Sequence, residues 1–264
     1  MSILLLHGLG ADRRQPLDLF GPILATSDAP TGRSEVVALD ARAHGANDTV
    51  GRPADFALDR LADEIAAGFT ATDASGGGPA APLTVIGISM GAAIALRLAV
   101  RGLLPIERAV FVRPAFDDRS MPPNLRLFPV IGQLLHDEGA EPGLARFRES
   151  DRFRAFTRET PAGANGLLSQ FTAPRAAERA IRLVEVPRNR AYTDDAELAG
   201  LAARGIRSLV VGAPRDPVHP FELAERWAGG LGAPLERLPA RDDGQAAQTA
   251  VVRQAVARWL AGTS

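Results

Sequence analysis

Short runs of apolar residues alternate along the chain with longer segments in which apolar residues recur every three or four positions. The runs predict buried strands, and they cover residues 3–6, 35–39, 83–86, 109–112, 208–211 and 235–238. The intervening segments predict helices. This alternation is typical of an α/β fold, in which a parallel sheet is covered by helices on both faces.

Helical spacing is clearest within residues 54–69, where Phe56, Leu61, Ile65 and Phe69 fall on one face. Similar patterns predict helices at residues 92–100, 195–204, 221–230 and 246–260. Gly102 follows one of them and is expected to end it in the left-handed conformation. The sequence Ser-Gly-Gly-Gly-Pro at residues 75–79 predicts a break between elements.

The alternation is lost between residues 114 and 193, where eight prolines separate helical patches. A helical cap inserted into the α/β core accounts for such a stretch. We therefore expect residues 1–113 and 194–264 to form the core and residues 114–193 to form the cap. The 264 residues suit one core with an insertion as well as they suit two domains.

Composition narrows the possible chemistry. Hydrophobic residues make up 46% and charged residues 23% of the chain, as in ordinary globular proteins, and the net charge of −1 gives no surplus of cations for nucleic acid. There is no cysteine, which excludes disulfides, thiolate zinc sites and a thiol nucleophile. There is also no lysine for a nucleotide P-loop or a Schiff base. Covalent chemistry must therefore use oxygen or nitrogen.

The chain shows no targeting or membrane signal. Its amino-terminal residues lack the cationic region of a signal peptide, and their apolar run is too short for one. The longest apolar stretch, residues 83–100, is interrupted by Thr84, Ser89 and Arg97, so we expect no membrane-spanning segment. A cytoplasmic location and a small-molecule partner follow by default. Nothing in the sequence indicates a metal, a cofactor or an oligomeric state.

A Gly-x-Ser-x-Gly pattern lies where a predicted strand meets a predicted helix, with Ser89 between Gly87 and Gly91. Chance alone would give about 0.1 such matches, so the position at the junction matters more than the pattern. A serine on so sharp a turn needs small residues on both sides to let strand and helix approach. Ser89 is therefore a candidate nucleophile, the alternative being a glycine-rich turn with an incidental serine.

At this point the chain resembles the α/β-hydrolase superfamily over nearly its whole length. Three further segments carry the resemblance: Leu6-His7-Gly8-Leu9-Gly10, Asp40-Ala41-Arg42-Ala43-His44-Gly45, and Val211 through Pro220. The resemblance implies an α/β-hydrolase fold with about six mostly parallel strands, flanking helices and an inserted helical cap. It also implies roles for four residues: Ser89 as nucleophile, Asp216 as orienting carboxylate, and the Leu9 and Met90 N–H groups as the oxyanion hole.

Physical arguments agree with these roles. The sharp turn at Ser89 is called the elbow below. Met90 begins the helix after it, where N–H groups lack intrahelical acceptors and the helix dipole favours negative charge. Leu9 follows a strand that we expect beside the elbow strand, about 5 Å away. For Asp216 the alternative is a carboxylate that caps the helix predicted at residues 221–230.

The family's histidine between the last strand and the last helix is absent, because residues 238–249 contain none. A serine hydroxyl needs an adjacent base, so the four histidines are the candidates: His7, His44, His136 and His219. His219 is the best of them, because it follows Asp216 by three residues and a helix N-terminus would keep it neutral. Its strand is expected two positions from the elbow strand, about 10 Å across the sheet, which makes its reach doubtful.

Several alternatives stay open from the sequence. A dinucleotide-binding interpretation of Gly8 and Gly10 is disfavoured by spacing, since Arg13 stands where a third glycine is needed and Asp40 lies too far along the chain. Asp242 and Asp243 suit a solvated turn better than a carboxylate pair. Members of the family usually have two further strands before the strand that leads to His7 and Gly8, including an antiparallel edge strand. Here that strand begins directly after Met1, so we expect six strands, all parallel. The chain is either naturally short at this end or begins upstream.

Two functions remain. One is an esterase-like enzyme that acts through Ser89 on a small ester, thioester or related acyl compound. The other is a non-hydrolytic or degenerate protein of the same fold that binds a small carbonyl compound without an activated serine. The missing late histidine favours the second function, and the intact elbow favours the first.

Overall fold

The computed structural model describes residues 2–25, 35–73 and 82–262. Within them, six strands form one sheet in the order β2-β1-β3-β4-β5-β6, and every neighbouring pair is parallel. The strands are β1 (Ser2–Leu6), β2 (Glu35–Leu39), β3 (Leu83–Ile88), β4 (Ile106–Val112), β5 (Arg207–Gly212) and β6 (Leu235–Arg237). The six parallel strands expected from the sequence are thus confirmed.

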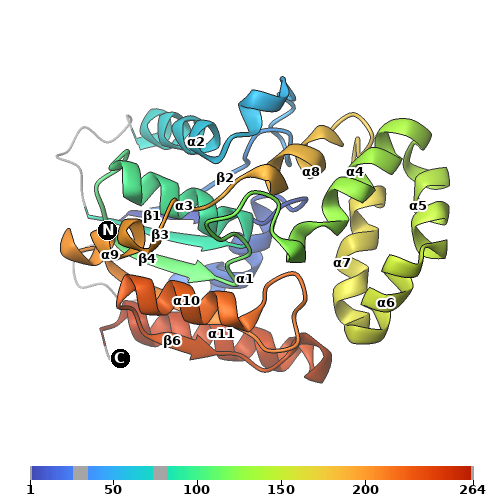
Figure 1. The fold of residues 1–264 in the computed structure, drawn as a ribbon. Coiled ribbons are helices and arrows are strands. Elements are labelled where there is room, and N and C mark those ends of the chain that lie inside the picture. The colour runs from blue at the N-terminus through green and yellow to red at the C-terminus, as the bar shows by residue number, and fades with distance from the viewer. Residues whose placement is uncertain (1, 26–34, 74–81, 263–264) are drawn as a thin grey trace.

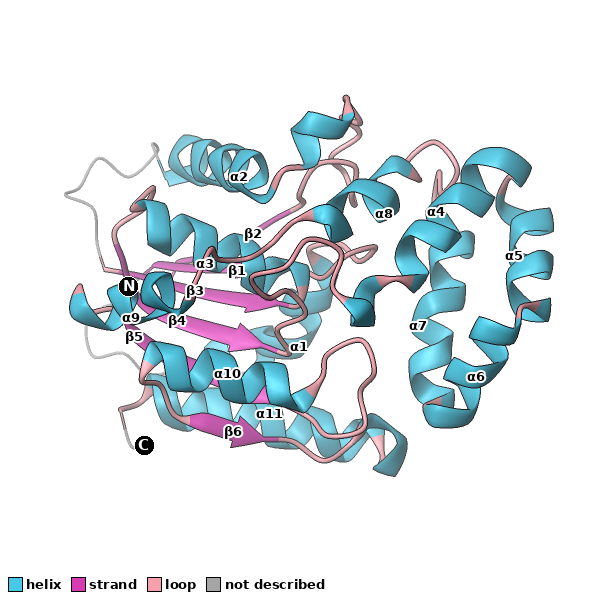
Figure 2. Cartoon of the chain, in the orientation of Figure 1, coloured by secondary structure: helices cyan, strands magenta, loops and turns pink. Residues whose placement is uncertain are grey.

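Helices cover both faces of the sheet (Figures 1 and 2). Side chains alternate along each strand, so Leu4 and Phe111 join one buried cluster while Leu5 and Val110 join the other. The first face is covered by α2 (Leu58–Asp73), α3 (Met90–Arg101), α9 (Asp195–Ala203) and α10 (Phe221–Leu231). The second is covered by α1 (Arg14–Leu24) and α11 (Gln245–Leu260). Two buried layers therefore hold the sheet in place.

Most predicted helices form, with their ends moved by a few residues. The expected helix at residues 54–69 consists of a 3₁₀ turn, Pro53–Phe56, followed by α2. Gly102 ends α3 in the left-handed conformation, at φ 62°, as expected. The break predicted at residues 75–79 lies outside the described residues.

The sequence pattern did not predict α1. This helix contains Pro16 and Pro22, which obscure its periodicity. Pro16 lies in the first turn, where an N–H would have no intrahelical acceptor, so the ring is tolerated there. Phe20 and Leu24 are buried against the second face of the sheet and hold the helix on it.

Between β4 and α9 the chain forms a group of helices beside the carboxyl ends of the strands (Figures 1 and 2). These inserted helices are α4 (Leu127–Glu138), α5 (Ala140–Glu149), α6 (Asp151–Glu159), α7 (Pro161–Thr172) and α8 (Ile181–Glu185). Ser150 and Thr160 cap the N-termini of α6 and α7 with their hydroxyl oxygens. The stretch is therefore helical, and it stands on the side of the sheet where the elbow opens.

Candidate active site

Ser89 lies alone between β3, which ends at Ile88, and α3, which begins at Met90. Its backbone angles are φ 54° and ψ −110°, a conformation that residues other than glycine rarely adopt. Hydrogen bonds on both sides hold it, since the Ser89 N–H donates to Val112 O at 2.9 Å and Ser89 O accepts from Ala92 N at 3.0 Å. The surrounding fold thus imposes the strained turn.

The two glycines of the elbow have no room for a side chain. A Cβ atom on Gly91 would lie 2.5 Å from Leu6 O, on the neighbouring strand β1. A Cβ atom on Gly87 would lie 2.6 Å from Ala92 N. Close packing of the strand and helix backbones therefore explains the glycines, as the sequence argument proposed.

The structure brings Ser89, His219 and Asp216 into one hydrogen-bonded chain. The Ser89 hydroxyl lies 3.0 Å from His219 Nε2. On the opposite side of the ring, His219 Nδ1 lies 2.9 Å from Asp216 Oδ2. With Nδ1–H donating to the carboxylate, the Nε2 lone pair is free to accept the proton of the hydroxyl.

Asp216 organises the turn that carries His219. Its Oδ1 atom accepts hydrogen bonds from the N–H groups of Val218 and His219, each at 3.1 Å. It does not cap α10, because Pro220 is the residue that precedes that helix. One carboxylate therefore fixes the backbone with one oxygen and the imidazole with the other.

His219 reaches Ser89, although the strand spacing had made this contact doubtful. Its strand, β5, does lie two positions from β3, with β4 between them. However, Ser89 and His219 both lie beyond the carboxyl ends of their strands, and the turn after β5 carries the imidazole across β4 to the elbow. The spacing of strands within the sheet does not limit side chains that project past its edge.

Charge and burial determine the protonation of this pair. Burial lowers the pKa of His219 below 6.5; the Asp216 carboxylate opposes this effect, while Arg113 and Arg241 add to it. Burial raises the pKa of Asp216, but the interaction with His219 and the two arginines lowers it by more, so the net pKa is below the usual value. At neutral pH the pair is a carboxylate beside a neutral imidazole.

Arg113 is a site residue that the sequence reasoning missed. It follows β4 directly, at φ 49°, and its Nη1 lies 3.7 Å from Asp216 Oδ2. That nitrogen is buried and has no hydrogen-bond acceptor among the described residues. Burial lowers the pKa of Arg113 to about 10, so the guanidinium keeps its charge at neutral pH. Only its place at the end of a predicted strand could have drawn attention to it.

The two predicted oxyanion donors lie on adjacent elements, because β1 pairs with β3 and Leu9 follows β1. Neither the Leu9 nor the Met90 N–H has an acceptor in the part of the chain that the structure describes. The neighbouring Gly8 N–H, by contrast, donates to Gln15 Oε1 at 2.7 Å. Both amides are therefore free to donate to a bound acceptor.

The other histidines do not reach Ser89. His7 Nε2 accepts from Ala41 N at 3.1 Å, and His44 Nε2 accepts from Gly10 N at 3.0 Å. Burial lowers the pKa of both rings, so they are neutral acceptors that hold the loop after β1. His136 is exposed on α4. None of these three histidines is placed to accept the proton of Ser89.

The loop after β6 supports the inserted helices. Asp242 Oδ2 accepts from the Thr160 hydroxyl at 2.7 Å, and Asp242 Oδ1 accepts from Ala162 N at 2.8 Å. Asp243 forms an ion pair with Arg215. The two carboxylates are exposed, as expected, but they bind different partners and do not form an acid pair.

A cavity of about 270 Å³ opens beside Ser89 and His219. Its apolar wall comes mainly from the inserted helices and the turns that lead into them: Phe116, Leu125, Phe128 and Leu167. Its polar wall includes Gln15, Arg113, Gln170 and Arg241, none of which the sequence singled out. The Gln170 Oε1 atom is buried without a partner among the described residues. The volume suits a small organic molecule with a few polar groups.

No group of three or more potential metal ligands occurs in the described ranges. None of the helices described is long and apolar enough to cross a membrane.

The model of the alpha/beta hydrolase family matches residues 3–255 of this chain. The chain belongs to this family. The Asp40 carboxylate accepts from Arg13 N at 2.7 Å and from Ala46 N at 2.8 Å.

Solved structures of similar fold cover nearly the whole chain. An esterase from Thermogutta terrifontis is 18% identical, with a TM-score of 0.67, and the match covers 100% of this chain and 90% of that one. An enol-lactonase from Burkholderia xenovorans is 19% identical, with a TM-score of 0.63, covering 99% and 90%. A hydrolase from Pseudomonas aeruginosa is 20% identical, with a TM-score of 0.63, covering 95% and 88%. A search of curated protein sequences found no match.

Proposed function

We propose that this family member hydrolyses a small ester, thioester or related acyl compound through Ser89. The observation that carries the proposal is the chain of hydrogen bonds from Ser89 through His219 to Asp216, at the wall of a cavity. A serine with a neutral imidazole at its hydroxyl, and a carboxylate behind that imidazole, has what nucleophilic catalysis needs.

In the proposed mechanism, Ser89 Oγ attacks the acyl carbon while its proton passes to His219 Nε2. Asp216 stabilises the imidazolium that forms, and the Leu9 and Met90 N–H groups stabilise the negative oxygen. His219 then gives the proton to the departing alcohol or thiol, leaving an acyl group on Ser89. A water molecule, deprotonated by His219, attacks that acyl group, and the carboxylic acid leaves as Ser89 regains its proton.

We further propose that residues 114–193 act as the cap over a core of residues 1–113 and 194–264. Phe128 on α4 and Leu167 on α7 place apolar side chains at the cavity, where they would hold the acyl chain. The cavity volume lies just below the usual range for ligand sites, which favours a small substrate. The cytoplasmic location and independence from a cofactor stay predictions from the sequence.

The alternative function, carbonyl binding without hydrolysis, depended on the missing late histidine. His219 supplies an imidazole from a different loop, so the main reason for the alternative no longer holds. We therefore propose hydrolysis in preference to binding alone.

A fluorophosphonate probe tests the proposal, because it reacts with activated serines. We expect one probe per protein molecule, and complete loss of labelling in Ser89→Ala. Ser169→Ala is the matched control, since Ser169 also lines the cavity but its hydroxyl donates to Gly166 O. A folded wild-type protein that takes up no probe would refute an activated serine.

A further inference from the structure

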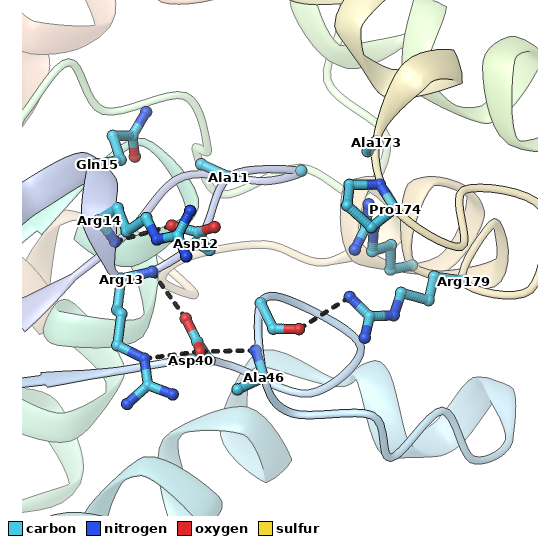
Figure 3. Close-up of a pocket in the computed structure, with 13 residues that line it drawn as sticks. Ala11, Asp12, Arg13, Arg14, Gln15, Asp40, Ala46, Ala173, Pro174 and Arg179 are labelled. Carbon is cyan, nitrogen blue, oxygen red and sulfur yellow. Dashed lines mark hydrogen bonds and ion pairs between the residues drawn. The ribbon is translucent and has the colours of Figure 1, made fainter.

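A second cavity, of about 550 Å³, adjoins the one at Ser89. The two share Gly10, Ala11 and Gln15, so the loop after β1 and the first turn of α1 lie between them. Figure 3 shows Arg13 and Arg14 on one wall of this second cavity and Arg179 on the opposite wall. The mechanism above uses none of these arginines.

Cations outnumber carboxylates in the lining, where four arginines face two aspartates. Asp40 is already engaged, because its oxygens accept from Arg13 N, Arg13 Nε and Ala46 N. Asp12 accepts from Arg14 N, and no ion pair joins the Arg14 guanidinium to a carboxylate in the described ranges. Arg13 pairs with Asp40 and Arg179 pairs with Asp48, so Arg14 and Arg182 are the lining arginines that no described carboxylate pairs with.

Arg182 is a buried cation in the lining of this cavity. It is 2% exposed, and none of the described carboxylates forms an ion pair with it. Its Nη1 donates to Ala43 O, but its buried Nε has no acceptor among the residues described. Burial, together with the neighbouring cation Arg179, lowers its pKa to about 10, which leaves it charged at neutral pH. A buried charge without a counter-ion is strongly unfavourable.

We propose that this second cavity binds a phosphate group. Guanidinium groups present N–H pairs that match phosphate oxygens, and arginines approach this cavity from opposite walls. Bound phosphate would compensate Arg182 and reach Arg14, the two cations without a carboxylate partner in the described structure.

The shared loop suggests the source of the phosphate. Because Gly10 and Ala11 line both cavities, the two sites are adjacent, and an elongated molecule lying across this loop would place its acyl carbon at Ser89 and its phosphate at the arginines. The substrate would then be a phosphorylated ester or thioester, an assignment that rests on the proposed function. Free phosphate is the other possible source.

Calorimetric titration with inorganic phosphate tests the site without requiring catalysis. We expect saturable binding at one site, with equal affinity in wild type and Ser89→Ala. Arg182→Gln should weaken binding at least about tenfold, the effect of losing one charge-assisted hydrogen bond. Arg14→Gln should weaken it several-fold, because Arg14 lines the cavity but is exposed and holds no other element.

Arg152→Gln is the matched control, since it removes the same charge from an exposed position on α6 outside both cavities. It should leave phosphate affinity unchanged. Absence of saturable binding, or equal losses in Arg14→Gln and Arg152→Gln, would overturn the proposal. The Arg14 variant decides the matter even if Arg182→Gln does not fold.

Two thioesters distinguish the sources of phosphate. S-acetylpantetheine and its phosphate monoester differ only in the charged group. A higher kcat/KM for the monoester that disappears in Arg14→Gln supports a phosphate carried by the substrate. Equal turnover together with phosphate binding supports a free ion. Phosphate binding without turnover of any ester would refute the proposed hydrolysis but support the phosphate site. Turnover of an ester without phosphate binding would support hydrolysis and refute the phosphate site.

Discussion

His219 Nε2 lies 3.0 Å from Ser89 Oγ, although the strands that carry the two residues, β5 and β3, are separated by β4. The imidazole belongs to the same turn as the Asp216 carboxylate that binds it. It does not belong to the loop before the last helix. The base and its orienting acid therefore have a common origin in the chain.

If His219 is the general base, His219→Ala should lower turnover of p-nitrophenyl acetate to the level of Ser89→Ala. The expected loss in kcat is about 10⁶-fold, because nucleophile and base act as a unit. Steady-state kinetics measure it. His136→Ala should keep the wild-type rate, since that imidazole is exposed on α4. An unchanged rate in His219→Ala would eliminate the role.

The pH profile should report the lowered pKa of His219. Only the neutral imidazole can accept the serine proton, so kcat/KM should rise on a limb centred below pH 6.5 and be level at neutral pH. In Arg113→Gln the limb should move to higher pH, because a cation that lowers the pKa of His219 is removed. A limb that stays in place would show that Arg113 does not act on the imidazole.

His44 should make the fold sensitive to acid. Burial and the nearby His7 and Arg182 hold the pKa of His44 well below 6.5, so the unfolded chain binds a proton at a higher pH than the folded protein does. The free energy of unfolding should therefore fall as the pH drops below 6.5, by at most about 1.4 kcal/mol per pH unit from this group.

Urea denaturation at several pH values measures this slope. His44→Gln should reduce it, because the amide oxygen of glutamine can still accept the Gly10 N–H bond but does not titrate. The same slope in wild type and variant would mean that His44 contributes nothing to the acid sensitivity.

A histidine restored to the late loop should not increase esterase activity. Gln245 lies at the start of α11 and does not line the cavity at Ser89. The Ser89 hydroxyl is already hydrogen-bonded to His219. We expect Gln245→His to match wild type in p-nitrophenyl acetate turnover. A large gain would show that the serine lacks a working base in the wild-type protein.

The strands and the elbow could be predicted because each depends on local sequence. Buried parallel strands require continuous apolar runs, and the turn at Ser89 requires glycine on both sides. Helix α1 was missed because its two prolines disrupt the local pattern, while its stability comes from packing on the sheet.

The rest of the site depends on tertiary structure. The reach of His219 depends on how the turn after β5 crosses a neighbouring strand, and a spacing of three residues from Asp216 does not encode that path. Arg113 was missed because its positive φ and its approach to Asp216 arise only once the chain is folded. The second cavity likewise joins arginines that are far apart in the sequence.

The turn held by Asp216 also simplifies the alignment of the proposed reaction. One carboxylate binds both the backbone and the ring of His219. The positions of Asp216 and His219 relative to each other are therefore fixed within one turn. The position of this turn therefore sets how the imidazole approaches the serine oxygen. The alignment of the proposed triad thus depends on where the turn from Asp216 to His219 lies relative to the bend at Ser89.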